Sequence, residues 1–226
     1  MFPHRCFLCG QVLLPRQYLC ADCRDKAPFV LPPVCDLCGR GKETCTCGGR
    51  HHAYERCVSP FYHTEQAKRG IAALKNEGYI HTVEGFAGEM AEVVRREYGG
   101  LPFTLVTSVP LHPKERRRRG FDQAALLGRE LANKLGLPYR PVLTKITPTR
   151  PQKELSALER SGNLLGVFEV TQPELVENRT VLLVDDVITT GATLDECAKM
   201  LKIYGAVEVY AVTAAAALLQ KAENGV

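Results

Sequence analysis

Long hydrophobic segments are absent from this sequence. It contains no run of about 18 consecutive apolar residues, the length at which a segment becomes a candidate transmembrane helix. Its first residues, Met-Phe-Pro-His-Arg-Cys, lack the apolar stretch of a secretory signal peptide. We therefore expect a protein without membrane insertion, and we expect it to be cytoplasmic.

The sequence also lacks a Walker A loop for nucleotide phosphates. Gly-Lys occurs only at Gly41-Lys42, where Asp36 takes the place of the first glycine and Glu43 follows the lysine. Asp185 and Asp186, which follow an apolar segment later in the chain, are therefore not part of a Walker B strand, because such a strand needs a Walker A loop as its partner.

Beyond residue 58 the sequence has almost no cysteine, because nine of its ten cysteines precede that position. Eight of these nine occur in pairs, and no export signal precedes them, which favours metal binding over disulfides. The first four have the Cys-x2-Cys-x10-Cys-x2-Cys spacing of a structural zinc ribbon. No βαβ pattern surrounds them, so a redox pair is disfavoured. The predicted ligands of this first unit are Cys6, Cys9, Cys20 and Cys23.

A second, less regular cysteine unit follows. Its favoured ligands are Cys35, Cys38, Cys45 and Cys47, with one residue instead of two between the last pair. That spacing can still hold one metal ion, but Cys57, His51 or His52 could replace one ligand. We expect His51 and His52 to be exposed loop residues and Cys57 to be a small buried residue. One or two structural zinc ions are predicted.

The chain has little net charge once these units are counted. Its 29 Lys and Arg residues exceed its 25 Asp and Glu residues by four (29 − 25). Each zinc ion bound by four thiolates would contribute about −2, which brings the balance near zero. The formal basicity is therefore weak evidence for a nucleic-acid partner.

A carboxylate pair and a hydroxyl-rich turn follow an apolar segment in residues 181–193. Residues 181–184 predict a buried parallel strand, because the run is too short and too β-branched for a helix. Asp185 and Asp186 then lie at its carboxyl end, where open α/β sheets bind ligands. The turn 189–193 opens a helix, whose free N–H groups favour phosphate. Since two carboxylates repel phosphate, they must face hydroxyls or a metal ion, and the combination indicates a sugar phosphate.

Strands and helices alternate along the rest of the chain, which predicts a mostly parallel, doubly wound sheet. Further strands are predicted at 57–62, 103–109, 142–146, 167–170 and 207–214. Helices are predicted from about residue 64, at 80–98, at 123–135 and after the turn. Asp122 is the expected N-cap of the helix Gln123–Leu135, which Gly136 ends. The polar segment 147–163 is expected to be an active-site lid and residues 220–226 a disordered tail.

Four consecutive arginines, residues 116–119, form the most basic segment. One interpretation is a solvated loop or a helix start with exposed charges. The other is that one or two of these arginines bind a polyanion, either pyrophosphate or a nucleic-acid backbone, through their planar donor forks.

Together these features resemble the ComF family, competence- and GntX-related proteins that join an N-terminal zinc finger to a type I phosphoribosyltransferase domain. The resemblance covers nearly the whole chain. It rests on the paired cysteines, on Val109-Pro110-Leu111, on Arg119-Gly120-Phe121-Asp122-Gln123 and on residues 181–193. The sequence departs from the family at Asp122, where Asn is usual, and at the single-residue gap of Cys45-Thr46-Cys47.

The resemblance implies a cysteine-rich zinc module in residues 1–58 and an α/β, type I phosphoribosyltransferase-like doubly wound parallel sheet in residues 59–226. It implies a site for phosphoribosyl pyrophosphate with Mg²⁺, in which the acidic pair holds the ribose and stabilises the sugar cation of transfer. The loop 109–112 would bind pyrophosphate, aided by Arg119 and by Arg150 or Lys153 of the lid. The implied ligand-binding residues are Asp185, Asp186, Thr189, Thr190, Gly191, Ala192, Thr193 and Arg119, with Asp185 and Asp186 as catalytic residues.

Two functions stay open at this point. One is an enzyme of DNA uptake or natural transformation that transfers phosphoribosyl to an unidentified acceptor. The other is a non-enzymatic adaptor for single-stranded DNA, in which the pocket is regulatory and a competence helicase is a further partner. Some salvage enzymes have a carboxylate where Thr189 stands, close to the purine, so Thr189 disfavours that chemistry.

Overall fold

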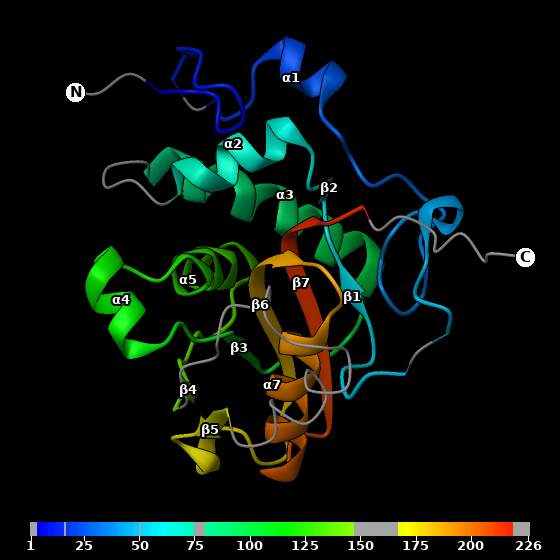
Figure 1. The fold of residues 1–226 in the computed structure, drawn as a ribbon, viewed down its shortest axis with the longest axis vertical. Helices are drawn as coiled ribbons and strands as arrows, with labels where there is room; N and C mark the ends of the chain where they lie inside the picture. The colour runs from blue at the N-terminus through cyan, green and yellow to red at the C-terminus, as the bar shows by residue number, and fades with distance from the viewer. Residues whose placement is uncertain (1–3, 16, 50, 75–79, 147–166, 219–226) are drawn as a thin grey trace, which may run out of the picture.

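A parallel β-sheet forms the centre of the structure (Figure 1). The computed structural model describes residues 4–15, 17–49, 51–74, 80–146 and 167–218. The strand order is β1-β7-β6-β3, with β2 also paired to β7, and every pair in this sheet is parallel. The strands are β1 (Cys57–Val58), β2 (Phe61–Tyr62), β3 (Leu105–Ser108), β6 (Thr180–Ile188) and β7 (Glu208–Ala216).

The strand predicted from residues 181–184 is longer than expected at its carboxyl end. Its neighbour β7 continues to Ala216, and the pairing extends through Asp185 with Thr213 and Ile188 with Ala216. On the other side, β3 pairs with β6 only as far as Val184. The last part of β6 therefore has a partner on one side only. At Asp185 the backbone of β6 is therefore paired with β7 but not with β3.

Helices cover both faces of the sheet, which confirms the doubly wound architecture. On one face α3 (Ile80–Tyr98) and α5 (Gln123–Leu135) enclose a core that includes Phe86, Leu127 and Leu182, all fully buried. On the other face α7 (Ala192–Ile203) packs with the antiparallel pair β4 (Leu143–Lys145) and β5 (Phe168–Val170). Truncating one such buried leucine typically costs about 2–5 kcal/mol.

The boundaries of α5 follow from local capping, as predicted. The Asp122 side chain accepts a hydrogen bond from the backbone N–H of Ala125, and Gly136 adopts a left-handed conformation with φ of 68°.

The segment with four consecutive arginines is helical: α4 (Pro113–Arg119) begins with proline at its first position and ends at Gly120. Of the two local structures considered for that segment, the helix is therefore the correct one.

The cysteine-rich segment packs on the sheet domain through Phe7. Its secondary structure comprises α1 (Ala21–Lys26) and the 3₁₀ turn η1 (Lys42–Thr44), and the chain then enters α2 (Glu65–Ala73) after the edge strands. A second 3₁₀ turn, η3, covers Pro173–Leu175. The Phe7 ring lies 4.7 Å from that of Phe86, between α2 and α3. Gly70 and Gly85 leave room for it, because a Cβ at either position would overlap Phe7.

None of the described helices combines the length and the hydrophobicity needed to cross a bilayer. The predicted lid 147–163, which includes Arg150 and Lys153, and the predicted tail 220–226 lie outside the described residues.

Candidate phosphoribosyl-binding site

The sheet topology places a crevice between the carboxyl ends of β3 and β6. From β3 the chain runs outward through α5 to Tyr139, which bridges back to Val106 on the outer side of β3. From β6 it runs the other way, through α7 to β7. Neighbouring strands whose connections leave in opposite directions form a topological switch point, where doubly wound sheets bind ligands.

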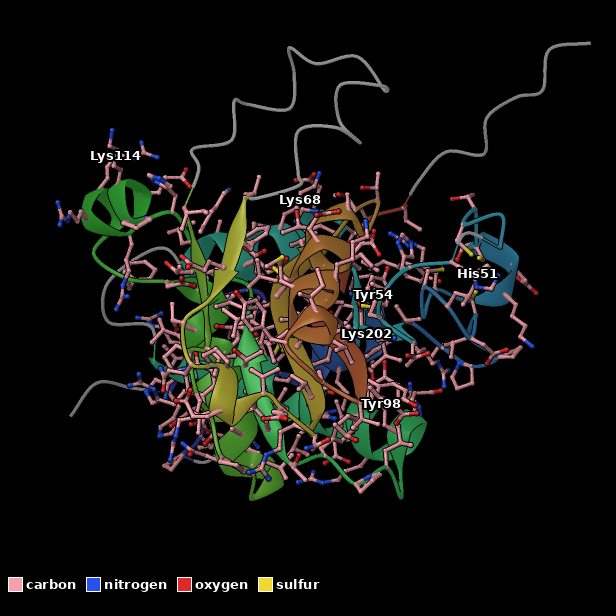
Figure 2. The ribbon with its side chains drawn as sticks, turned by 90° about the horizontal axis from the view of Figure 1, so that it is seen from below. His51, Tyr54, Lys68, Tyr98, Lys114 and Lys202 are labelled. Atoms are coloured by element: carbon pink, nitrogen blue, oxygen red, sulfur yellow. The ribbon has the colours of Figure 1, made fainter. Side chains whose placement is uncertain are left out.

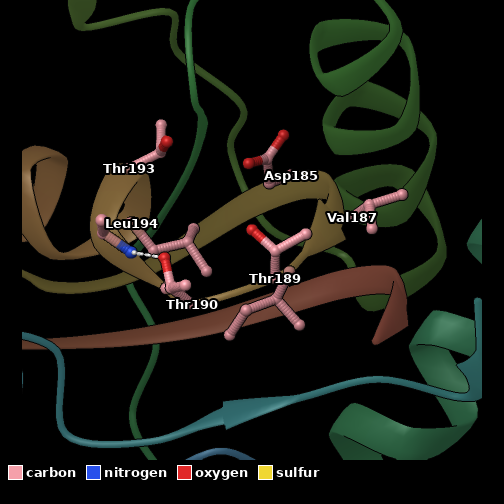
Figure 3. A pocket seen from close by; sticks show the side chains of 9 residues that line it. Asp185, Val187, Thr189, Thr190, Thr193 and Leu194 are labelled. Carbon is pink, nitrogen blue, oxygen red and sulfur yellow. Dashed lines mark hydrogen bonds between the residues drawn. The ribbon is translucent and has the colours of Figure 1, made fainter. Parts of the chain in front are cut away.

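A tight turn leads from β6 into α7 on one side of this crevice. The residues that line a small pocket here are Asp185, Val187, Ile188, Thr189, Thr190, Gly191, Ala192, Thr193 and Leu194 (Figure 3). The Thr190 hydroxyl accepts a hydrogen bond from the Ala192 N–H at 3.4 Å, and Thr189 and Thr190 are exposed. The hydroxyls and the first amides of α7 together form a site suited to an anion.

Gly191 is required by this turn for two reasons. Its φ of 83° lies in the left-handed region that favours glycine. A Cβ there would also overlap the hydroxyl of Tyr54, which is 3% exposed and has no hydrogen-bond partner among the described residues. Burial raises the pKa of Tyr54 well above its ordinary value, so the phenol is neutral. The segment before β1 therefore packs directly against the turn.

His52 takes part in this packing, so the expectation that it is an exposed loop residue is wrong. Its side chain is 14% exposed, its ring stacks on Tyr54 at 4.7 Å, and its Nδ1 lies 3.6 Å from a carboxylate oxygen of Asp195 on α7. The same oxygen accepts a hydrogen bond from the Ala53 N–H at 2.5 Å. His51 is exposed as expected.

The acidic pair occupies the end of β6 that is paired with β7 but not with β3. Asp185 lines the pocket, and its carboxylate accepts a hydrogen bond from the Asp186 N–H at 2.8 Å. Asp186 is not among the pocket-lining residues, but its side chain lies close enough to interact with that of Asp185. Burial, followed by repulsion from the Asp186 carboxylate, raises the pKa of Asp185 well above its ordinary value. The site therefore holds a carboxylate that favours a compensating positive charge or hydroxyl donors.

The loop 109–112 follows β3, the strand next to β6 in the sheet. It leaves β3 where the Val109 N–H donates to the Val184 carbonyl at 2.9 Å. Asp122 then fixes the loop, because its second carboxylate oxygen accepts from the Leu111 N–H at 2.9 Å. Asp122 thus caps α5 and orders the loop with one side chain. Arg119 ends α4 beside this loop, and its side chain lies outside the described part of the structure.

The two sets of cysteines named from the sequence lie in two clusters, each with all four sulfurs within 4.8 Å of one another. The clusters are Cys6, Cys9, Cys20 and Cys23, and Cys35, Cys38, Cys45 and Cys47. The Sγ atoms of Cys9 and Cys20 are 3.7 Å apart, and those of Cys38 and Cys45 are 3.5 Å apart. Four thiolates about 2.3 Å from a tetrahedral zinc ion are separated by about 3.8 Å, so both clusters fit zinc.

The thiol chemistry of the second cluster agrees with this fit. Burial and the neighbouring thiols raise the pKa of Cys45 to about 12, whereas backbone hydrogen bonds from Cys38 and Leu37 lower the pKa of Cys35 to about 7 in spite of its burial. A bound zinc ion would hold both as thiolates. Cys57, one of the alternative ligands, is fully buried at the start of β1, as expected for a structural residue.

Two parts of the chain match known families. Residues 1–58 match the double zinc ribbon domain, and residues 122–224 match the phosphoribosyl transferase domain. DNA utilization protein YhgH of Salmonella typhi is 31% identical over 208 residues, which cover 90% of this chain and 86% of that protein. The chain belongs to the ComF family. Competence protein F of Haemophilus influenzae is 29% identical over 92% of this chain and 95% of its own. Competence protein ComFC of Bacillus subtilis is 25% identical, with 84% and 80% covered.

Solved structures of more distant proteins are similar to part of this ComF family member. Glutamine phosphoribosylpyrophosphate amidotransferase from B. subtilis is 21% identical, with a TM-score of 0.41, over 61% of this chain and 28% of that chain. APRTase from Giardia lamblia is 22% identical, also with a TM-score of 0.41, over 62% of this chain and 70% of its own. The parallel sheet and the matching domain family show the phosphoribosyltransferase fold.

Proposed function

We propose that this ComF family protein binds phosphoribosyl pyrophosphate with magnesium and transfers its phosphoribosyl group to an acceptor used in DNA uptake or utilization. The observation that carries the proposal is the crevice itself. A turn suited to phosphate (residues 189–193, called the phosphate-type turn below) follows β6, and the Asp185 carboxylate lines the same pocket. A second ordered loop, residues 109–112, follows the neighbouring strand β3. The catalytic domain family and the names of the relatives agree with this chemistry and this process.

Each part of the ligand has a matching part of the crevice in this proposal. The 5′-phosphate accepts hydrogen bonds from the amides and hydroxyls of the turn, namely Thr189, Thr190, Gly191, Ala192 and Thr193. The ribose hydroxyls donate to Asp185 and Asp186. In the loop 109–112 the His112 N–H is the donor left for the pyrophosphate, because the Val109 and Leu111 N–H groups donate to Val184 and Asp122 and Pro110 has none. The Arg119 guanidinium would add charge-assisted hydrogen bonds. Magnesium, when bound, would neutralise the pyrophosphate while keeping most of its waters.

In this proposal the acidic pair, Asp185 and Asp186, also stabilises the transition state of phosphoribosyl transfer. As the bond from C1 to pyrophosphate breaks, positive charge develops on the ribose ring. The carboxylates of Asp185 and Asp186 stabilise that charge electrostatically, and that of Asp185 is already held by the Asp186 N–H. No carboxylate stands at Thr189, which disfavours a purine acceptor of the salvage type. The zinc ribbon module suits a cytoplasmic protein.

Titration calorimetry tests this function directly. We expect phosphoribosyl pyrophosphate to bind the purified protein in the presence of Mg²⁺ and to bind at least about tenfold more weakly when EDTA replaces the ion, since the ligand's charge is then uncompensated. Ribose 5-phosphate and pyrophosphate serve as part-ligand controls. An absence of measurable heat at millimolar ligand in the presence of Mg²⁺ would refute the proposal.

A second candidate, an adaptor for single-stranded DNA with a regulatory pocket, has its own structural support. Helix α4 presents Lys114, Arg116, Arg117 and Arg118 as exposed side chains, and Lys114 projects away from the sheet (Figure 2). The names of the relatives include DNA utilization and competence. Single-stranded DNA would contact this helix through its phosphates, and a competence helicase is the proposed further partner.

The salt dependence of DNA binding tests the role of α4. Arg116→Gln, Arg117→Gln and Arg118→Gln in one variant should reduce the slope of log K against log salt by up to about 2, because each arginine that binds a phosphate contributes about 0.7 to that slope. Gel-shift titrations from low to physiological salt give the slope. The matched control replaces Arg95, Arg96 and Lys202, which are exposed elsewhere. Equal slopes for the two variants would exclude α4 from a DNA interface.

A further inference from the structure

The side chain of Arg40 links the second cysteine cluster to the phosphate-type turn. Arg40 follows Cys38 by two residues and is 3% exposed. Its Nη2 donates to the carbonyl oxygens of Thr189 at 2.6 Å and Ile188 at 3.4 Å, and its Nε donates to that of Ala217 at 2.8 Å. One guanidinium therefore holds the end of β6, the first residue of the turn and the residue after β7.

The backbone that carries Arg40 is itself fixed to the edge of the sheet. Gly39 has a φ of 63°, and a Cβ there would overlap the Cys57 backbone. The Cys57 N–H donates to the Leu37 carbonyl, and the Gly41 N–H donates to the Tyr62 hydroxyl, both at 2.9 Å. The second cluster and β1–β2 thus form one packed unit. A change in the shape of the cluster therefore displaces the base of the Arg40 side chain.

The buried positive charge of Arg40 also needs a counter-charge, which the second cluster can provide. Its three hydrogen bonds to β6, the turn and β7 go to neutral carbonyl groups, which leave a buried positive charge uncompensated. A zinc ion held by four thiolates carries about −2 (2 − 4), and Cys38 is one of those four sulfurs. The filled cluster therefore provides both the anchor and the counter-charge of this guanidinium.

We propose that Arg40 is a positioning residue for the phosphate-type turn, and that it couples metal occupancy of the second cluster to ligand binding at the turn. This inference rests on the proposed binding of phosphoribosyl pyrophosphate. Because coupling between two sites is reciprocal, metal loss weakens ligand binding and the ligand protects the metal site.

Substitution of Arg40 tests the positioning role. Arg40→Met keeps the length of the side chain without its donors, and it should lower affinity for phosphoribosyl pyrophosphate by about 5–150-fold, the usual range of coupling between sites. Arg40→Lys keeps the charge and one donor and should recover part of that loss. Both variants should retain the zinc content of the unchanged protein. Arg24→Met, an exposed arginine directly after Cys23 of the first cluster, is the matched control.

Cysteine alkylation tests the coupling. With a chelator present, alkylation of Cys45 and Cys47 is followed over time by peptide mass spectrometry, with Cys20 and Cys23 of the first cluster as the internal reference. Saturating phosphoribosyl pyrophosphate should slow alkylation of the second cluster several-fold and leave the first unchanged. In Arg40→Met the ratio of rates with and without ligand should be about one. An effect on packing alone would not remove this ligand dependence.

Hydrogen exchange of peptides spanning residues 186–194 separates this inference from the proposed function, because it needs no ligand. Arg40→Met should accelerate exchange there, while Arg24→Met should not. If the unchanged protein binds the ligand but its two clusters are alkylated equally with and without it, the coupling is refuted. If it binds no ligand, the proposed function fails, and unchanged exchange in Arg40→Met then also refutes the positioning role.

Discussion

Replacing Asp185 and Asp186 by asparagine is expected to weaken binding of phosphoribosyl pyrophosphate with Mg²⁺ by at least about a hundredfold. Hydrogen bonds to charged groups each contribute about 1.5–3 kcal/mol, so losing two charged acceptors removes about 3–6 kcal/mol. A factor of ten in affinity corresponds to about 1.4 kcal/mol. Asparagine keeps the shape of the side chain, and titration calorimetry measures the loss.

The same double substitution should stabilise the free protein at neutral pH. The pKa of Asp185 is raised above its ordinary value of 3.8, chiefly by burial and then by Asp186. The folded protein therefore holds a proton that the unfolded chain releases, and its stability falls as the pH rises above about 4 through the folded-state pKa. Asparagine has no charge to bury. The variant should have the higher Tm at pH 7, and the difference should shrink towards pH 4.

The control for this pair removes the same charge elsewhere. Asp22→Asn with Asp25→Asn changes two exposed carboxylates on α1 and should alter neither ligand affinity nor the pH dependence of Tm. Normal ligand binding by the Asp185 and Asp186 variant would remove the acidic pair from the proposed site. A lower Tm at pH 7 would show that these carboxylates stabilise the fold, in conflict with the raised pKa.

The parts of the fold that depend on local signals were predictable from the sequence. Asp122 and Gly136 set the ends of α5, and both the cap and the left-handed residue are determined within a few residues of chain. The extension of β6 to Ile188 was not predictable in this way. It depends on the length of β7, a partner that follows in the sequence and whose carboxyl end contains three consecutive alanines rather than β-branched residues.

The residues of the site divide in the same way. The sequence named the acidic pair and the turn because they are adjacent, and the structure places Asp185 and the turn around one pocket. It did not identify Arg40 or Tyr54, because their contacts join distant parts of the chain. Arg40 and Thr189 are 149 residues apart, and no spacing rule connects them. The sequence signal for Arg40 was a lone arginine directly after a Cys-x-x-Cys-Gly turn, which by itself suggests only solvent exposure.

The largest effect on folding is expected from losing the metal of the first cluster. Zinc binding to such modules contributes about 10–16 kcal/mol at neutral pH, whereas burial of one phenylalanine contributes about 3–5 kcal/mol. Helix α1 has six residues, too few to persist alone. Without the metal, we therefore expect the packing of Phe7 between α2 and α3 to be too weak to keep residues 4–27 folded.

Cys6→Ser with Cys9→Ser tests this expectation against Cys197→Ala, which changes a buried cysteine outside both clusters. The unchanged protein and Cys197→Ala should each contain about two zinc ions per chain, and the double variant about one. Hydrogen exchange should then show residues 4–27 unprotected in the double variant, while β6 and β7 stay protected by their own core. One zinc ion in the unchanged protein would mean that the second cluster is empty. Retention of two in the double variant would refute the assignment of the first. Because Phe7 contacts Phe86 directly, release of the segment uncovers an aromatic surface, so dye binding should rise together with the loss of metal.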